Sequence, residues 1–260
     1  MSRLDPSQTV FCYDGSLEGF LSAVFDAYAR HLYPQRICQD GCVQLGFGQQ
    51  LVDVATDLAL AERVRVGLSS RAGVSTYRTV RTAFLSDADG KEDALFAYIV
   101  HAMERGYRAR GDIAQECVAR VEALAQSVYN ERERMYQFLR FEKMENGVFF
   151  ACVNPKANVV PIMMRHFEER FSTQPFVIYD EVHHLAGVCS QGTTTLVLAD
   201  TLAIPDRSSD EASYQRLWKC FYDAVSNERR YNPDLRRSFV PKRLWRNMTE
   251  FKLAVEMRTS

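Results

Sequence analysis

The sequence of 260 residues has no long apolar run and no apolar leader. No window approaches the roughly 20 apolar residues that a membrane-spanning helix needs, and the first residues, MSRLDPSQ, lack the apolar core of a secretion signal. These two absences predict a cytoplasmic protein that does not insert into a membrane. The seven cysteines are odd in number and scattered among apolar neighbours, which is typical of reduced, buried thiols and not of a disulfide framework.

Several catalytic and cofactor motifs are also missing. The sequence has no glycine-rich phosphate loop, no nucleophile elbow and no HExxH zinc motif. Cys38 and Cys42 are spaced like the first two ligands of a radical S-adenosylmethionine cluster, but Leu45 stands where the third thiolate is needed. In DEVHH (180–184), adjacent histidines at a strand start point to opposite faces, so only one can join Asp180. We therefore expect no metal and no other cofactor.

The patterns that are present predict a succession of strands and helices. A β-branched and aromatic run over 9–13 is typical of a buried strand, and Ser16 is placed to cap the helix that follows. The region over 34–52 contains three glycines and predicts a loop. Helical periods cover 56–87, 92–107, about 112–139 and about 159–171, and β-type runs cover 148–153, 176–179, 185–189 and 195–198.

This succession predicts an α+β fold, with a mixed or antiparallel sheet surrounded by helices. A chain of this length can form one large domain or two small ones, and we expect a single α+β domain over 1–260. Three regions are distinct within it. They are a helical middle segment over about 54–145 that could form a subdomain, a polar linker over about 200–210 and a basic C-terminal segment over 216–246.

Positive charge is concentrated in the basic C-terminal segment. Residues 216–246 hold nine Lys or Arg against three acidic residues, a local charge of +6 in a chain whose total is −1. Binding to a phosphate backbone needs such cations with aromatics among them, because cations release counterions and flat rings stack on bases. A solvated helix face with a tail whose aromatics fill the core explains the same composition. The candidate nucleic-acid-binding residues are Arg229, Arg230, Arg236, Arg237, Lys242, Arg243 and Arg246.

A helix is expected at the start of this segment. Ser208 and Glu211 have the spacing of a capping box. The apolar stripe of the expected helix consists of Tyr214, Leu217, Trp218, Phe221 and Val225. We therefore expect Trp218 to lie in the core, whereas Arg229 and Arg230 follow the helix and can face a ligand.

The order of residues in this segment carries more information than its charge. W-K at Trp218, followed by E-R-R-x-N-P-x-L-x-x-x-F-x-P-K-R-x-W over 228–245, closely resembles the C-terminal signature of a bacterial family assigned to DNA metabolism or DNA repair. Four other stretches resemble the family in the expected order. They are YDGSLEGFLSAVFDAY (13–28), AFLS (83–86), FLRF (138–141) and NVVPIMMRHFEERF (158–171).

The resemblance implies a partner. Members of this family are encoded beside a radical S-adenosylmethionine DNA-repair protein, or are fused ahead of a uracil-DNA glycosylase-type domain. The glycosylase motifs of those fusions, a glycine-rich water-activating loop and a His-Pro-Ser loop, are absent here. The family has a His-Arg pair where Glu133 and Arg134 stand, so this chain lacks the histidine of any His-based mechanism.

Asp14 and Glu18 are candidates for a functional cleft. A strand that turns at Asp-Gly-Ser into a helix N-terminus can present N–H groups to an anion, and the resemblance at YDGS supports that role. A capped strand-to-helix turn explains the same residues.

The other cleft candidates lie in the second half of the chain. His166 and Arg170 are four residues apart on one helix face, a spacing at which they could jointly meet a phosphate. A half-buried histidine beside Phe167 explains the same pattern. The remaining candidates are Glu131, Arg134 and Arg140. Ion pairs on an exposed helix face would also explain Glu131 and Arg134.

Two classes of function agree with these observations. The first is a nucleic-acid-binding accessory protein, in which the basic C-terminal segment grips DNA and a radical S-adenosylmethionine or glycosylase-type partner performs the chemistry. The second is an enzyme on nucleic acid, in which carboxylates such as Asp14, Glu18 or Glu131 face the basic residues across a cleft. Binding of a nucleotide or another small anion is a third. Convergence of the cleft candidates and the C-terminal arginines in one pocket would favour the enzyme.

Overall fold

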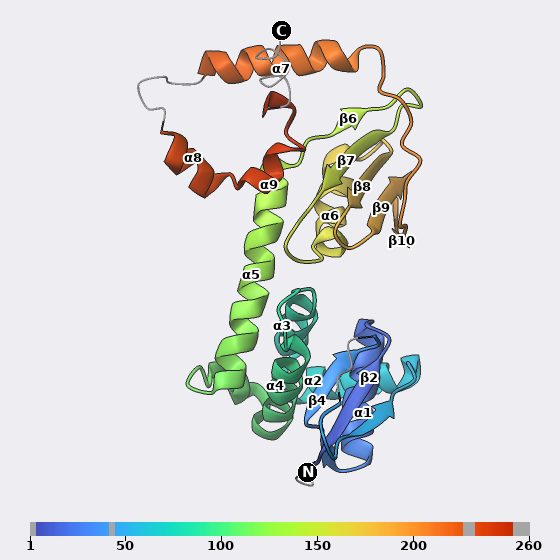
Figure 1. The fold of residues 1–260 in the computed structure, drawn as a ribbon, viewed down its shortest axis with the longest axis vertical. Coiled ribbons are helices and arrows are strands. Elements are labelled where there is room, and N and C mark those ends of the chain that lie inside the picture. The colour runs from blue at the N-terminus through green and yellow to red at the C-terminus, as the bar shows by residue number, and fades with distance from the viewer. Residues whose placement is uncertain (1–3, 42–44, 226–231, 252–260) are drawn as a thin grey trace. The chain divides into compact units, whose positions relative to one another are not determined.

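The computed structural model describes residues 4–41, 45–225 and 232–251, and its fold is α+β, as predicted (Figure 1). The chain divides into two compact units, residues 1–129 and 130–260. Helix α5 (Glu116–Phe138) runs through the boundary in the sequence. Compact units need not fold separately, so the expected single domain stays a prediction. None of the helices in the described ranges is both long and apolar enough to cross a bilayer.

The first unit contains a parallel sheet of three strands in the order β4–β2–β5. The central strand β2 (Thr9–Tyr13) is buried throughout and matches the predicted strand. The loop predicted over 34–52 is wrong, because β4 (Arg36–Gln39) and β5 (Gln50–Asp53) pair with the two edges of β2. Both strands are short and partly polar, so tertiary pairing decides their conformation more than local sequence does.

Helices make up most of the rest of the first unit. Ser16 caps α1 through its hydroxyl, which accepts a hydrogen bond from the Gly19 N–H at 2.9 Å, as predicted. The helical period over 56–87 is broken at Gly73, whose φ of 97° ends one helix and starts the next. The elements are α1 (Leu17–Ala29), α2 (Leu58–Ala72), α3 (Val74–Phe84), α4 (Lys91–Arg105) and the short η1 (Gly106–Gly111), with a small parallel pair β1 (Asp5–Pro6) and β3 (Leu32–Tyr33).

The second unit contains a mixed sheet of five strands in the order β10–β9–β8–β7–β6. Its strands are β6 (Glu142–Lys143), β7 (Phe149–Val153), β8 (Phe176–Asp180), β9 (Leu185–Ser190) and β10 (Thr193–Leu198). Helix α6 (Val160–Phe171) connects β7 to β8, which makes this pair parallel while the others are antiparallel. This is the predicted strand, helix, strand and hairpin succession. The ring of Phe141 packs edge-to-face on the rings of Phe167 and Phe171, with 5.3 and 4.6 Å between ring centres. These contacts pack α6 against the residue that precedes β6.

Three helices follow the sheet in the C-terminal part of the second unit. They are α7 (Glu211–Val225), α8 (Pro233–Phe239) and α9 (Lys242–Trp245). The capping box expected from Ser208 and Glu211 is replaced by contacts with β6. A Glu211 carboxylate oxygen accepts a hydrogen bond from the Lys143 N–H at 2.9 Å, and the Ser208 N–H donates to the Lys143 carbonyl. The expectation that Trp218 is a core residue is wrong, since the apolar stripe of α7 remains largely exposed.

Candidate functional site

Arg243, one of the predicted nucleic-acid-binding residues, forms an ion pair inside the protein. Its guanidinium contacts the carboxylate of Glu131, a residue of α5 that is only 2% exposed. Arg134 Nη1 and the Lys156 N–H also donate to Glu131, at 3.3 and 3.0 Å. A carboxylate so buried needs these donors, because an unpaired charge inside a protein is costly. Arg243 therefore fastens α9 to α5.

Arg140, which follows the end of α5, makes a second ion pair with the C-terminal part. It donates to both carboxylate oxygens of Glu250, at 2.8 and 3.3 Å, and Glu250 is 1% exposed. Its guanidinium also lies 5.5 Å from the centre of the Trp218 ring. The two carboxylates and two arginines thus connect residues more than 100 positions apart in the sequence.

The other predicted cations have different placements. Arg246 is exposed and lies 3.3 Å from Glu181, and Lys242 is exposed on α9. Arg229 and Arg230 lie outside the described residues, and the side chains of Arg236 and Arg237 on α8 are not described either. The structure therefore leaves the proposed role of these four arginines as a prediction.

Asp14 and Glu18 belong to the first unit, whereas the other five cleft candidates belong to the second. Asp14 Oδ1 accepts hydrogen bonds from the Ser16 N–H and hydroxyl, at 2.9 and 2.6 Å, and Oδ2 accepts one from Thr56 at 2.7 Å. Partial burial opposes ionisation, but these hydrogen bonds outweigh it and lower the pKa of Asp14 below its ordinary value. The carboxylate therefore stabilises the turn between β2 and α1, which agrees with the interpretation of this stretch as a capped strand-to-helix turn.

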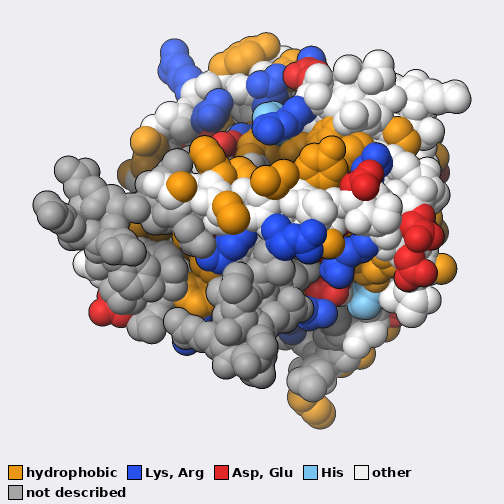
Figure 2. Space-filling model, turned by 90° about the horizontal axis from the view of Figure 1, so that it is seen from above, with side chains coloured by type: hydrophobic (Ala, Val, Ile, Leu, Met, Phe, Trp, Pro, Cys, Tyr) orange, Lys and Arg blue, Asp and Glu red, His pale blue; other side chains and the backbone are white. Residues whose placement is uncertain are grey.

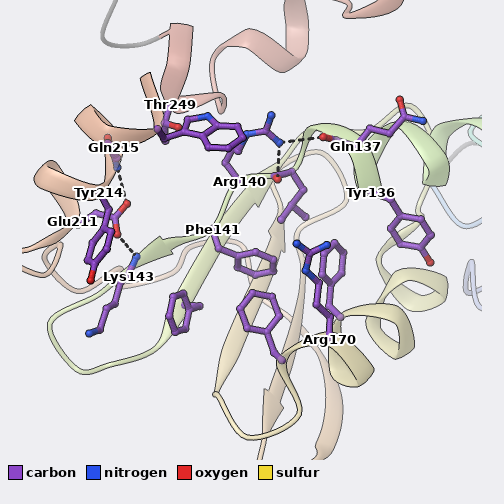
Figure 3. Close-up of a pocket in the computed structure, with 15 residues that line it drawn as sticks. Tyr136, Gln137, Arg140, Phe141, Lys143, Arg170, Glu211, Tyr214, Gln215 and Thr249 are labelled. Atoms are coloured by element: carbon purple, nitrogen blue, oxygen red, sulfur yellow. Dashed lines mark hydrogen bonds between the residues drawn. The ribbon is translucent and has the colours of Figure 1, made fainter. Parts of the chain in front are cut away.

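A groove of about 680 Å³ lies within the second unit, between α7 on one side and α6, β6 and the end of α5 on the other (Figure 3). We call it the α7 groove. Its aromatic lining consists of Tyr136, Phe141, Phe149, Phe167, Phe171, Tyr214 and Trp218. Three cations, Arg140, Lys143 and Arg170, share this lining. Figure 3 shows Arg170 extending from α6 into the groove, with the ring of Phe141 beside it.

The α7 groove contains two of the predicted cleft residues, Arg140 and Arg170. His166 is not among its lining residues, and its exposed ring stacks on Tyr136 at 4.2 Å and meets Phe167 edge-on at 5.1 Å. The joint role of His166 and Arg170 stays a prediction. Sequence reasoning missed Lys143, Tyr214 and Trp218 as site residues. The signal that could have found the groove was FLRF (138–141), which supplies both Arg140 and Phe141.

Two positive charges of the α7 groove have no acidic partner among the described residues. Lys143 and Arg170 make no ion pair with any residue in the described part of the chain. A second hollow of about 430 Å³ offers a contrast, since its Arg207 and Arg246 lie 2.8 and 3.3 Å from Glu142 and Glu181. On the face seen from above, hydrophobic side chains form a band flanked by Lys and Arg side chains (Figure 2). The α7 groove differs from this hollow in that its apolar rings lie beside two cations without an ion pair to any described residue.

The possible metal ligands are arranged as a turn. Asp180 is fully buried, with its carboxylate 2.5 Å from His183 Nδ1 and hydrogen-bonded to the N–H groups of Val182 and His183. These bonds close the turn between β8 and β9. Within 4–41, 45–225 and 232–251, no three His, Cys, Asp or Glu side chains are grouped to hold a metal ion. Cys42, which the half motif with Cys38 requires, lies outside those ranges.

Residues 89–250 match the sequence model of a family described as a domain of unknown function, DUF4130. The chain belongs to this family. No curated protein matches it. Among solved structures, the chain is similar to a DHH domain described as a member of a family of ribosomal proteins, with 10% identity, a TM-score of 0.31, and coverage of 84% of this chain and 78% of that one.

The DUF4130 match includes the whole α7 groove. It begins at the turn before α4 and ends at Glu250, the carboxylate that holds Arg140. Both ion pairs, Glu131 with Arg243 and Arg140 with Glu250, lie within the matched residues. Of the C-terminal signature, Trp218 lines the groove, whereas Arg243 pairs with Glu131.

Proposed function

We propose that this DUF4130 protein binds nucleic acid in the α7 groove, in a role in DNA metabolism or repair. The observation that carries the proposal is the combination of aromatic rings with Lys143 and Arg170 in one groove of about 680 Å³. Proteins that bind nucleic acid without sequence preference use cations for its phosphates and flat rings for its bases. The groove supplies both, and Arg229, Arg230, Arg236, Arg237 and Lys242 would add cations beyond it.

The groove is better equipped for binding than for catalysis. Glu211 is the one carboxylate among its described lining residues. Its two oxygens accept hydrogen bonds from the Lys143 N–H and from the Gln215 side chain, both at 2.9 Å. A general acid or base must reach the proton that it transfers, and a carboxylate held by two donors of its own fold is poorly placed for that. This supports the accessory role over an enzyme with a carboxylate and arginine site.

The direct test is the salt dependence of binding to a fluorescently labelled oligothymidylate, followed by anisotropy. Contacts of Lys143 and Arg170 with phosphates predict a log–log slope of about −1.4, because each contact to a single strand contributes about 0.7. A steeper slope would show that cations of the basic C-terminal segment add contacts. Absence of binding at low salt, or a slope near zero, would contradict the proposal.

We also propose that the chemistry resides in a partner, the radical S-adenosylmethionine protein or glycosylase-type domain that the family resemblance implies. Cys38 lacks the thiolate set for such a cluster, because position 45 is Leu. The two proteins are expected to co-elute in size-exclusion chromatography at moderate salt, since stable interfaces depend on desolvated centres more than on rim charges. Separate elution, together with turnover of nucleic acid by this chain alone, would favour the enzyme instead.

A further inference from the structure

A row of exposed aromatic rings follows one face of α7. Tyr214, Trp218 and Phe221 are spaced by four and three residues, so they lie on the same side of the helix. Their exposed fractions are 62, 40 and 57%. Tyr214 and Trp218 line the α7 groove, and Phe221 continues the row along the helix. Large rings that remain exposed in a row, beside cations that have no ion pair with a described residue, point to a ligand with flat, apolar faces.

The spacing of these rings is wider than that of neighbouring bases in a duplex. The ring centres of Trp218 and Phe221 lie 5.8 Å apart and their planes are tilted by 33°. Tyr214 precedes Trp218 by four residues, a rise of about 6 Å along the helix. Neighbouring bases in one strand of a duplex are only about 3.4 Å apart along its axis. Bases that stack on successive α7 rings must therefore be pulled apart, which requires that they be unpaired.

One ring of the row is held in place. The guanidinium of Arg140, itself fixed by Glu250, covers one face of Trp218 at 5.5 Å from the ring centre. A base can then stack only on the other face of the indole, so Arg140 acts as a positioning residue for Trp218. Lys143 and Arg170 belong to other parts of the groove lining, which places phosphate contacts beside the row of rings.

We infer that the α7 groove takes a single unpaired strand, with consecutive bases stacked on Tyr214, Trp218 and Phe221 and its phosphates held by Lys143 and Arg170. This inference rests on the proposed function and gives it a substrate class. A duplex does not satisfy the geometry, because its bases are paired and closely stacked. The negative charge of the strand complements the cations, which the apolar face of a protein partner would leave without a counterion.

The fluorescence of Trp218 can report whether a base stacks on its ring. The chain has two tryptophans, and a Trp245→Phe background leaves Trp218 as the sole indole. Trp245 donates a hydrogen bond to the Val240 carbonyl and stacks beside Phe251, so circular dichroism must first show that this background retains the fold. Titration with oligothymidylate is expected to quench the Trp218 fluorescence, because a base stacks on the ring. A duplex of equal length should bind at least about tenfold more weakly and quench little.

Substitution of the rings gives the second readout. Trp218→Ala should weaken binding of oligothymidylate about 5- to 100-fold, the effect of losing one stacked base. Trp218→Phe, which keeps a flat ring, should restore most of the affinity and guards against a folding defect of the alanine variant. Leu217→Ala is the matched control, since Leu217 is also exposed on the same helix and has no ring. It should leave the affinity within about twofold, as expected for a residue outside the contact.

The outcomes separate the inference from the proposed function. Equal binding of duplex and single strand, without quenching of Trp218, would overturn the unpaired-strand inference while binding itself stood. The inference also fails if Trp218→Ala binds like wild type, or if Leu217→Ala weakens binding as much as Trp218→Ala does. If neither form of DNA binds at low salt, both the inference and the proposed function fail.

Discussion

Replacing Glu131 by alanine is expected to lower the free energy of unfolding by about 3–5 kcal/mol, the cost of breaking a buried ion pair from one side. Glu131 is 2% exposed and serves three donors, Arg243, Arg134 and the Lys156 N–H. Arg243 has two further guanidinium nitrogens, Nε and Nη1, that are buried without a hydrogen-bond partner among the described residues. Loss of the carboxylate would leave its positive charge without compensation.

The measurement is urea unfolding followed by circular dichroism, with Glu133→Ala as the control. Glu133 is two residues along the same helix, half exposed and paired with Arg132 at 2.6 Å, so its loss should cost no more than about 1 kcal/mol. A double variant, Glu131→Leu with Arg243→Met, should lose less stability than Glu131→Ala, because it removes both charges together. Equal effects of Glu131→Ala and Glu133→Ala would show that the pair does not fasten α9 to α5.

Reversing two charges of the α7 groove, Lys143→Glu with Arg170→Glu, is expected to weaken binding of oligothymidylate about 100-fold or more at low salt. Two phosphate contacts are lost and two repulsive charges are added. The log–log salt slope should become flatter by about 1.4. Neither side chain makes an ion pair with a described residue, so the fold should tolerate both changes. Anisotropy over a range of salt concentrations measures both quantities.

Two comparison variants decide where the phosphates lie. Lys156→Glu with Arg165→Glu changes the net charge equally at exposed positions that do not line the α7 groove, and should weaken binding far less. Arg236→Glu with Arg237→Glu tests the basic C-terminal segment itself. If that variant abolishes binding and the groove variant does not, the nucleic-acid site belongs to the C-terminal segment and the groove proposal is wrong.

Local patterns were sufficient for most of the secondary structure. The buried strand at 9–13, the cap at Ser16, the long helix that is α5 and the four strands after Gly147 all follow from periodicity and capping chemistry within a few residues. The strands β4 and β5 do not, because they pair with β2 residues that lie 26 and 41 positions earlier, as Arg36 with Val10 and Gln50 with Thr9, and their own residues are partly polar. Pairing across the sheet, and not local preference, makes them strands.

The sequence by itself determined the α+β class, the membership of the DUF4130 family and the concentration of cations near the C-terminus. Only the tertiary structure decided which cations can meet a ligand. Arg243 and Arg140 look like ligand-binding residues in the sequence, yet Glu131 and Glu250 hold them from more than 100 residues away. Trp218 has the spacing of a core residue but lies exposed beside Arg140. Burial and charge pairing depend on which distant segments come into contact, and local periodicity cannot predict these contacts.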